Sequence, residues 1–166
     1  AELLKKKLVI LVNSRSYLDM IDLELFMDKL RLKELIATAH IYGVHVIMSN
    51  HDFHRTPGKE ELMTRLMAMK RMEADILKIA VMPKNEEDLL TLLEVTQQMK
   101  SRVPKQALVT ISMGKQGLLS RISGEIFGSS ITFATMHGQS APGQIPYEEL
   151  QKVLQMIHQN LMSDDI

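Results

Sequence analysis

A lysine inside an apolar segment is the first feature of this sequence that could carry chemistry. Residues 75–83 read DILKIAVMP, an apolar run with β-branched members that ends at Pro83 and is typical of a buried strand. Lys78 lies within it, although a buried ammonium group is costly unless it is paired or loses its proton. A desolvated lysine can attack a carbonyl carbon and form a Schiff base. The alternative is a structural lysine, either at a strand end or paired with Asp22 or Glu24.

Two histidines follow another predicted strand directly, in the segment SNHDFHRTP (49–57). Catalytic residues gather at the carboxyl ends of parallel barrel strands. His51 is the better candidate for general acid–base catalysis, because it lies nearest the strand end and an imidazole exchanges protons near neutral pH. A metal site is less favoured, since His51 and His54 have no third ligand nearby and HExxH is absent. The alternative is a polar loop in which both histidines are bystanders.

Two carboxylates lie two residues apart in MIDLEL (20–25), so Asp22 and Glu24 point to the same face of the predicted strand. Such a pair could share acid–base work, or it could neutralise buried lysines and arginines. We favour the second role.

Two later loops add polar groups. Arg121, in SRISGEIFGSS (120–130), could bind a substrate carboxylate through two hydrogen bonds. Ser140 and Gln144, in SAPGQI (140–145), could exchange hydrogen bonds with hydroxyl groups. The alternative is a solvated arginine and an ordinary Pro-Gly turn.

Strand and helix patterns alternate along the chain, which predicts parallel strands joined by right-handed crossovers. The predicted strands are Asp19–Leu25, Val44–Asn50, Ile76–Met82, Ala107–Met113 and Ser130–Ala134. The predicted helices are 2–13, Lys29–Tyr42, a helix from the Thr56-Pro57 start to Met72, Glu86–Ser101, Gly117–Phe127 and Pro146–Asn160.

The strands favour a barrel over an open doubly wound sheet. Polar residues interrupt the strand segments, whereas a doubly wound sheet normally keeps both faces apolar. Neither GxGxxG nor GxxxxGK[ST] is present. A complete eight-fold barrel needs about 200–250 residues. We therefore predict one α/β domain over 1–166, a (β/α) barrel of TIM type represented by about five of its eight β/α units.

The composition narrows the class of protein further. The chain has 166 residues, 45% of them hydrophobic, and its 20 basic residues balance 20 acidic ones. Zero net charge predicts no general attraction to nucleic acid or to a membrane, and no apolar stretch approaches a membrane span. The absence of cysteine excludes disulfides and thiolate chemistry, and no signal-peptide pattern is visible. We expect a cytoplasmic protein.

The motifs MIDLEL, VIMSNHDFHRTP, ADILKIAVMP, SRISGEIFGSS and SAPGQI, in this order and spacing, resemble type I 3-dehydroquinate dehydratase. The resemblance runs from about Tyr17 to Gln159. It implies a (β/α)8 barrel, usually a homodimer, that needs no metal or other cofactor. It also implies a lyase that dehydrates 3-dehydroquinate to 3-dehydroshikimate in aromatic amino-acid biosynthesis.

The resemblance also implies roles for single residues. Lys78 would form the imine with the substrate ketone, and His51 would remove and deliver protons. The other matched residues would bind or support: Arg121 at the substrate carboxylate, Ser140 and Gln144 at its polar groups, Met113 lining the pocket, and Asp22 and Glu24 in a supporting role.

The first three strands of the family have no counterpart in this sequence. They supply a glutamate that orients the catalytic histidine, together with an acidic and a basic residue that face the substrate. The chain could be a fragment, or two copies could complete one another. Two other functions stay open: another lysine Schiff-base barrel enzyme such as an aldolase, and a half-barrel without turnover that serves as a scaffold or interaction module.

Overall fold

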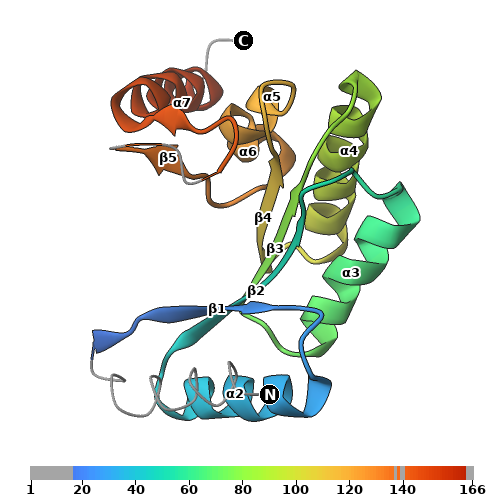
Figure 1. Ribbon diagram of the computed structural model, residues 1–166. Coiled ribbons are helices and arrows are strands. Elements are labelled where there is room, and N and C mark those ends of the chain that lie inside the picture. Colours follow the sequence, from blue (N-terminus) through green and yellow to red (C-terminus); the bar gives the residue numbers. More distant parts are fainter. Residues whose placement is uncertain (1–16, 137, 139–140, 164–166) are drawn as a thin grey trace.

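The computed structural model describes residues 17–136, 138 and 141–163, and it shows an α/β fold (Figure 1). The predicted helix over 2–13 and the candidate Ser140 lie outside the described residues. Four parallel strands form one sheet in chain order: β1 (Met20–Glu24), β2 (His45–Asp52), β3 (Ile76–Val81) and β4 (Ala107–Ser112). The helices α2 (Lys29–Ile41), α3 (Lys59–Arg71) and α4 (Glu86–Arg102) connect them. The predicted alternation of strands and helices is therefore confirmed.

The two faces of β3 have different surroundings, as the alternation of side chains in a strand requires. Leu77, Ile79 and Val81 lie in the large apolar core that includes residues of α2, α3 and α4. Ala80, on the opposite face with Lys78, belongs to a smaller apolar cluster with residues of β4. Lys78 therefore lies on the sheet face that turns away from the helices.

The prediction of a fifth strand of the sheet over Ser130–Ala134 is wrong. The segment begins beside β4, where the Ser130 N–H donates to the carbonyl of Leu108 over 2.6 Å. The next position along β4 is taken by a side chain, since the Thr110 N–H donates to Ser129 Oγ at 3.1 Å. A hydroxyl in that place interrupts the backbone ladder. The sheet of the described residues thus has four strands rather than five.

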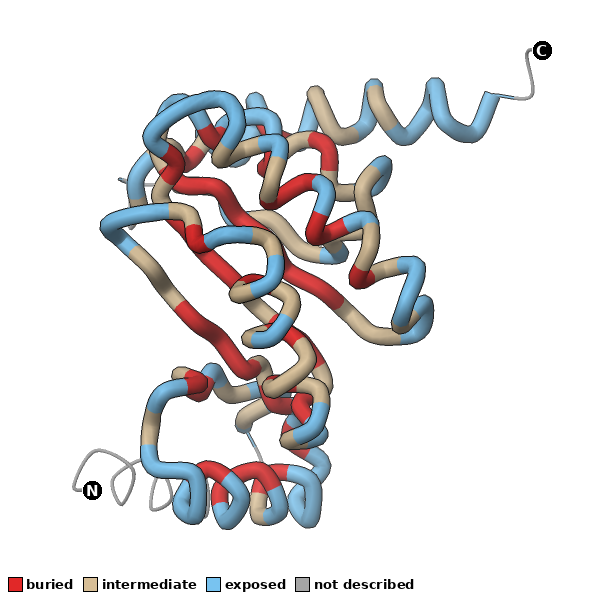
Figure 2. Tube along the Cα trace, turned by 90° about the vertical axis from the view of Figure 1, so that its right-hand side faces the viewer, coloured by how far each residue is buried: buried red, intermediate tan, exposed pale blue. Residues whose placement is uncertain are grey.

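Beyond this point the chain forms a small separate sheet. Two short strands, β5 (Ala134–Thr135) and β6 (Ile145–Pro146), pair in parallel and lead into α7 (Tyr147–Met162). Figure 1 shows α7 beside β5 and apart from the four-stranded sheet. Only Leu150 of this helix is buried, and Figure 2 shows its long exposed stretch.

Two predicted helices differ at their ends. The helix expected to start at Thr56-Pro57 begins at Lys59, and its N-cap is Gly58 without a side-chain hydrogen bond. The helix expected over Gly117–Phe127 is divided into α5 (Leu118–Ile122) and α6 (Gly124–Phe127). The division falls at Ser123, whose hydroxyl donates to the carbonyl of Leu119 over 2.7 Å.

Asp75 connects the starts of β2 and β3 to the end of α2. Its Oδ2 accepts the N–H of Val46 at 2.7 Å and lies 2.9 Å from His40 Nε2, while Oδ1 lies 3.7 Å from His45 Nδ1. Burial raises the pKa of Asp75, but the Val46 hydrogen bond and the two imidazoles outweigh it and leave the pKa below its ordinary value. The ionised form is therefore the one that the fold stabilises.

Asp75→Ala should lower the free energy of unfolding at pH 7 by about 1–2 kcal/mol, because hydrogen bonds to a charged group are lost at a partly exposed site. A carboxyl with a depressed folded-state pKa stabilises the protein above its unfolded value, and that stabilisation is lost as pH falls through the folded value. The difference between variant and unchanged chain should therefore shrink below about pH 4. Urea denaturation at several pH values measures it. Asp19→Ala, at an exposed position nearby, is the control. A difference independent of pH would contradict the assignment.

Candidate active site

Lys78 is held by an ion pair on the face of β3 that turns away from the helices. Its Nζ lies 2.9 Å from Asp22 Oδ2 of β1, and only 12% of its side chain is exposed. The ring centroid of Phe133 lies 5.1 Å from the same nitrogen. The other oxygen of Asp22 accepts the hydroxyl of Ser49. The pairing with Asp22 compensates for burial of the charge, as the structural alternative expected, and it also fixes where Nζ lies.

His51, near the end of β2, contacts the second carboxylate of β1. Its Nδ1 lies 3.1 Å from Glu24 Oε2, and its ring stacks on Phe53 with centroids 5.9 Å apart. The other oxygen of Glu24 accepts the side-chain amide of Asn50 at 3.0 Å. Asp22 and Glu24 therefore each hold one of the two candidate catalytic groups, which agrees with a supporting role.

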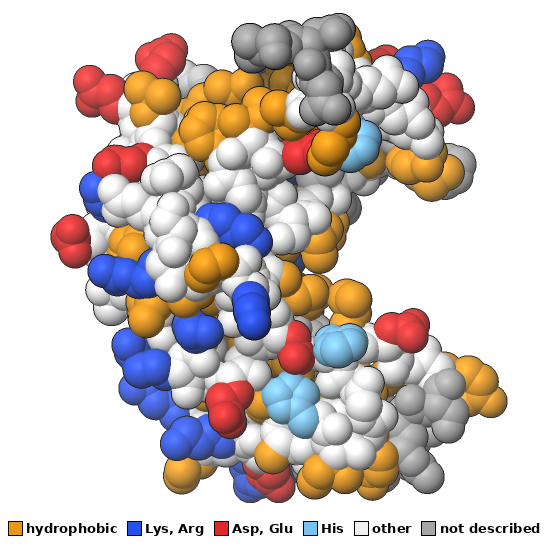
Figure 3. Space-filling model, turned by 180° about the vertical axis from the view of Figure 1, so that it is seen from behind, with side chains coloured by type: hydrophobic (Ala, Val, Ile, Leu, Met, Phe, Trp, Pro, Cys, Tyr) orange, Lys and Arg blue, Asp and Glu red, His pale blue; other side chains and the backbone are white. Residues whose placement is uncertain are grey.

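One cavity of about 260 Å³ brings most of the candidate residues together. The predicted members of its lining are His51, Lys78, Met113, Arg121 and Gln144. Phe53, Ala80, Ile111, Phe133 and Ala141 complete the lining and were not predicted. The molecule is hollowed on one side, and histidine side chains lie at the lower rim of the hollow (Figure 3). The cavity thus places a potential nucleophile, an imidazole and a guanidinium around one space.

Arg121 lies in α5 and is buried, so the alternative of a solvated arginine in a loop is wrong. Only 1% of the residue is exposed, and its guanidinium donates to the carbonyls of Pro142 at 2.9 Å and Phe133 at 3.5 Å. Its Nε has no partner among the described residues. Burial lowers the pKa of Arg121, although an arginine remains protonated at neutral pH. A buried cation with unused hydrogen-bonding capacity favours an anionic ligand.

Ala141 and Gln144 line the cavity together with Arg121. Gln144 is buried, and its Oε1 lies 3.4 Å from the backbone nitrogen of Ala141. A second cavity, of about 490 Å³, lies between the helices α5, α6 and α7, and Arg121 lines it as well. Arg121 therefore lines both cavities.

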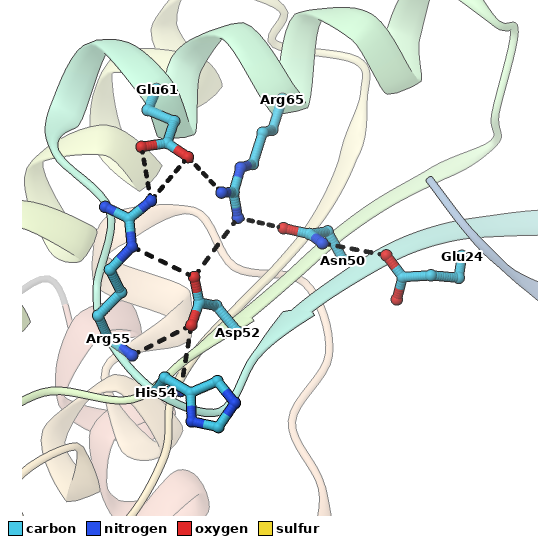
Figure 4. Close-up of polar contacts among 7 residues, drawn as sticks. All are labelled: Glu24, Asn50, Asp52, His54, Arg55, Glu61 and Arg65. Atoms are coloured by element: carbon cyan, nitrogen blue, oxygen red, sulfur yellow. Dashed lines mark hydrogen bonds and ion pairs between the residues drawn. The ribbon is translucent and has the colours of Figure 1, made fainter. Parts of the chain in front are cut away.

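A polar network extends from His54 and Arg55 to Glu24 (Figure 4). We call it the Arg65 network; its members are Glu24, Asn50, Asp52, His54, Arg55, Glu61 and Arg65. His54 enters it only through its backbone N–H, which donates to Asp52 Oδ1 at 3.1 Å. Of His51 and His54, only His51 lines the cavity.

Metal ligand clusters and membrane-spanning helices are both absent from the described part of the chain. Within it, no group of three or more histidine, aspartate or glutamate side chains could hold a metal ion. None of its helices has both the length and the apolar character that a membrane span requires.

Parallel strands that alternate with helices, with a lysine, a histidine and an arginine around one cavity on the sheet face that the helices leave open, are typical of the (β/α) barrel class of proteins. The family model for type I 3-dehydroquinase matches residues 5–161, and this chain belongs to that family. The 3-dehydroquinate dehydratase of Clostridium novyi is 48% identical over 157 residues, which make up 95% of this chain and 58% of the relative.

Solved structures agree with this assignment. The type I 3-dehydroquinate dehydratase from Clostridium difficile superposes with a TM-score of 0.82 at 44% identity, over 96% of this chain and 59% of that one. The enzyme from Geobacillus kaustophilus gives a TM-score of 0.87 at 36% identity, over 93% and 60% of the two chains. The predicted TIM-type α/β fold is confirmed. The chain spans about three fifths of the length of these relatives.

Arg121→Met should loosen the two loops that the guanidinium connects, because the carbonyls of Phe133 and Pro142 would lose their donors. Losing one such bond corresponds to about 1 kcal/mol, so amide hydrogen exchange near these two residues should accelerate about five- to tenfold. Mass spectrometry of exchanged peptides measures the rate. Arg102→Met, at an exposed position in α4, should leave it unchanged. Equal rates in both variants would mean that Arg121 does not hold the loops.

Proposed function

We propose that this chain carries the catalytic lysine and histidine of a type I 3-dehydroquinate dehydratase, a lyase that converts 3-dehydroquinate to 3-dehydroshikimate in aromatic amino-acid biosynthesis. The observation that carries the proposal is the shared cavity of Lys78, His51 and Arg121. Membership in the family supports the same reaction. We further propose that the chain forms the later part of one (β/α) barrel domain and acts as a cytoplasmic homodimer without cofactor.

The first chemical step is attack by Lys78. The Lys78 ammonium first gives up one proton to solvent, and the neutral amine then adds to the ketone carbon of the substrate. A second proton from the same nitrogen and one returned by solvent leave with the former carbonyl oxygen as water, which gives a protonated imine. Asp22, 2.9 Å from Nζ, keeps the nitrogen in place before attack, and its negative charge stabilises the cationic imine that forms there. The protonated imine withdraws electrons and thereby acidifies the adjacent carbon.

His51 would then move the protons of the elimination. Its Nδ1 contacts Glu24, so Nε2 is the atom that takes the proton from the carbon next to the imine. The imidazolium returns this proton to the hydroxyl on the following carbon, which leaves as water while the carbon–carbon double bond forms. A further water hydrolyses the imine and releases product and Lys78. Two waters leave and one is consumed, so the net reaction is loss of one water.

The remaining cavity residues would bind the substrate. Arg121 would pair with the substrate carboxylate, because it is a buried cation whose Nε has no partner among the described residues. Gln144 would bind hydroxyl groups, and Met113 would supply an apolar wall. The family resemblance assigns Ser140 to the same hydroxyl groups. The small size of the cavity, about 260 Å³, suits a compact polar ring rather than a polymer.

Trapping the imine tests the proposal. Incubation with 3-dehydroquinate and sodium borohydride should reduce the imine and leave a stable adduct on Lys78, detected by mass spectrometry of peptides. Lys78→Met should abolish the adduct, whereas Lys84→Met, at an exposed position three residues beyond β3, should retain it. His51→Ala should slow adduct formation and turnover by about 10²–10⁴-fold.

The proposal would be refuted by a folded chain, verified by circular dichroism, that gives no adduct on Lys78. An adduct that forms equally well with unrelated keto acids would instead indicate another lysine Schiff-base enzyme.

A further inference from the structure

A continuous line of side-chain contacts leads from α3 to His51. Arg65 Nη1 donates to Asn50 Oδ1 at 2.5 Å, and Asn50 Nδ2 donates to Glu24 Oε1 at 3.0 Å. Glu24 Oε2 lies 3.1 Å from His51 Nδ1. Asn50 is only 3% exposed and the Arg65 side chain 12%, so the first contact is well shielded from water. Figure 4 shows the part of this line that runs from Arg65 of α3 through Asn50 of β2 to Glu24 of β1.

Arg65 determines which way the Asn50 amide faces. A side-chain amide has an acceptor at one end and donors at the other, whereas a guanidinium has donors only. Arg65 therefore holds the amide oxygen toward α3 and leaves the amide N–H groups for Glu24. Were the amide turned around, its oxygen would face the carboxylate of Glu24, which also only accepts when ionised. The cation thus selects the one orientation in which Asn50 and Glu24 attract each other.

Glu24 transmits this orientation to His51. With Oε1 occupied by Asn50, the carboxylate presents Oε2 to Nδ1 of the imidazole. An acceptor at Nδ1 favours the tautomer that carries its proton there, and Nε2 is left as the base. We propose that Arg65 is a positioning residue for His51 and acts through Asn50 and Glu24. This inference rests on the proposed function, because it assigns the proton transfers to His51.

Arg65 is itself fixed from several sides. Its Nη2 donates to Glu61, which lies one helical turn earlier in α3, and its guanidinium lies 4.0 Å from Asp52 and 5.4 Å from the ring centroid of Phe26. Burial raises the pKa of Glu61, but the hydrogen bonds and charges of Arg65 and Arg55 outweigh it and lower the pKa. Glu61 therefore stays ionised at neutral pH, and Arg65 has little freedom to leave Asn50.

Arg55 offers a matched control within the same network. Its guanidinium contacts the same two carboxylates, Glu61 at 3.1 Å and Asp52 at 3.7 Å. Its side chain is 51% exposed, and the network joins it to those carboxylates rather than to Asn50. The two arginines thus share acidic partners and differ in the contact that leads to His51.

Comparing Arg65→Gln with Arg55→Gln tests the inference. In Arg65→Gln, kcat should fall about 10–100-fold with KM changed less than about threefold, because His51 loses orientation while substrate-binding residues remain. The low-pH limb of the kcat profile should shift, and ¹⁵N NMR of His51 should show a larger share of the Nε2-protonated tautomer. Arg55→Gln should leave kcat, the pH profile and the tautomer ratio near those of the unchanged chain. Arg65→Lys, which restores one donor, should recover part of kcat.

A second variant covers the case in which Arg65→Gln does not fold. Asn50→Asp has the same shape but presents a carboxylate oxygen to Glu24, so it should change the His51 tautomer ratio in the same direction. An unchanged tautomer ratio in a folded Arg65 or Asn50 variant would overturn the inference. The proposed function would fail separately, through the absence of a Lys78 adduct in the unchanged chain, since the tautomer is measured without turnover.

Discussion

The ion pair between Lys78 and Asp22 is the constraint on which the site depends. A lysine on the inner face of a parallel sheet must be compensated, and the compensating carboxylate comes from β1, two strands away in the sheet. The pair requires that β1, β2 and β3 keep their register, because a shift of one residue would turn Asp22 to the opposite face. The large apolar core between the sheet and α2, α3 and α4 fixes this register from the other side. Packing on one face of the sheet therefore sets the electrostatics on the other.

Much of the fold follows from local patterns, and the main exception, the missing fifth strand, has a non-local cause. The strands β1 to β4 lie within one or two residues of their predicted bounds, because each is a short apolar run closed by polar or turn residues. The segment after Ser129 has equally suitable residues for a strand. Its ladder is interrupted by a side-chain hydroxyl on Thr110 N–H, and sequence periodicity does not register such a contact. The division between α5 and α6 falls at Ser123, a residue whose hydroxyl bonds to the backbone carbonyl of Leu119 within the same segment.

The sequence predicts which residues form most of the candidate site, but it does not predict which of them contact one another. Lys78, His51, Met113, Arg121 and Gln144 do meet around one cavity, as parallel strand ends predict. Spacing alone left open which carboxylate meets which cation, since Asp22 and Glu24 share a face of β1. Phe133 was not predicted as a site residue, because it lies in the segment that was predicted as a regular strand. The structure places its ring beside Lys78. Arg65 and Asn50 gave no sequence signal, as their contact joins a helix face to a strand.

The position of Glu24 changes the interpretation of the histidine. The family resemblance implied that the glutamate orienting His51 comes from strands without a counterpart in this sequence. In the structure, Glu24 lies 3.1 Å from His51 Nδ1 and is itself held by Asn50. A carboxylate in this position can fix the tautomer and stabilise an imidazolium, which is what an orienting glutamate does. The acidic motif of β1 thus provides one carboxylate partner for the lysine and one for the histidine. Because Glu24 is bound through Asn50 to Arg65 of α3, the cavity face and the helical face of the sheet are joined by a polar connection as well as by the core.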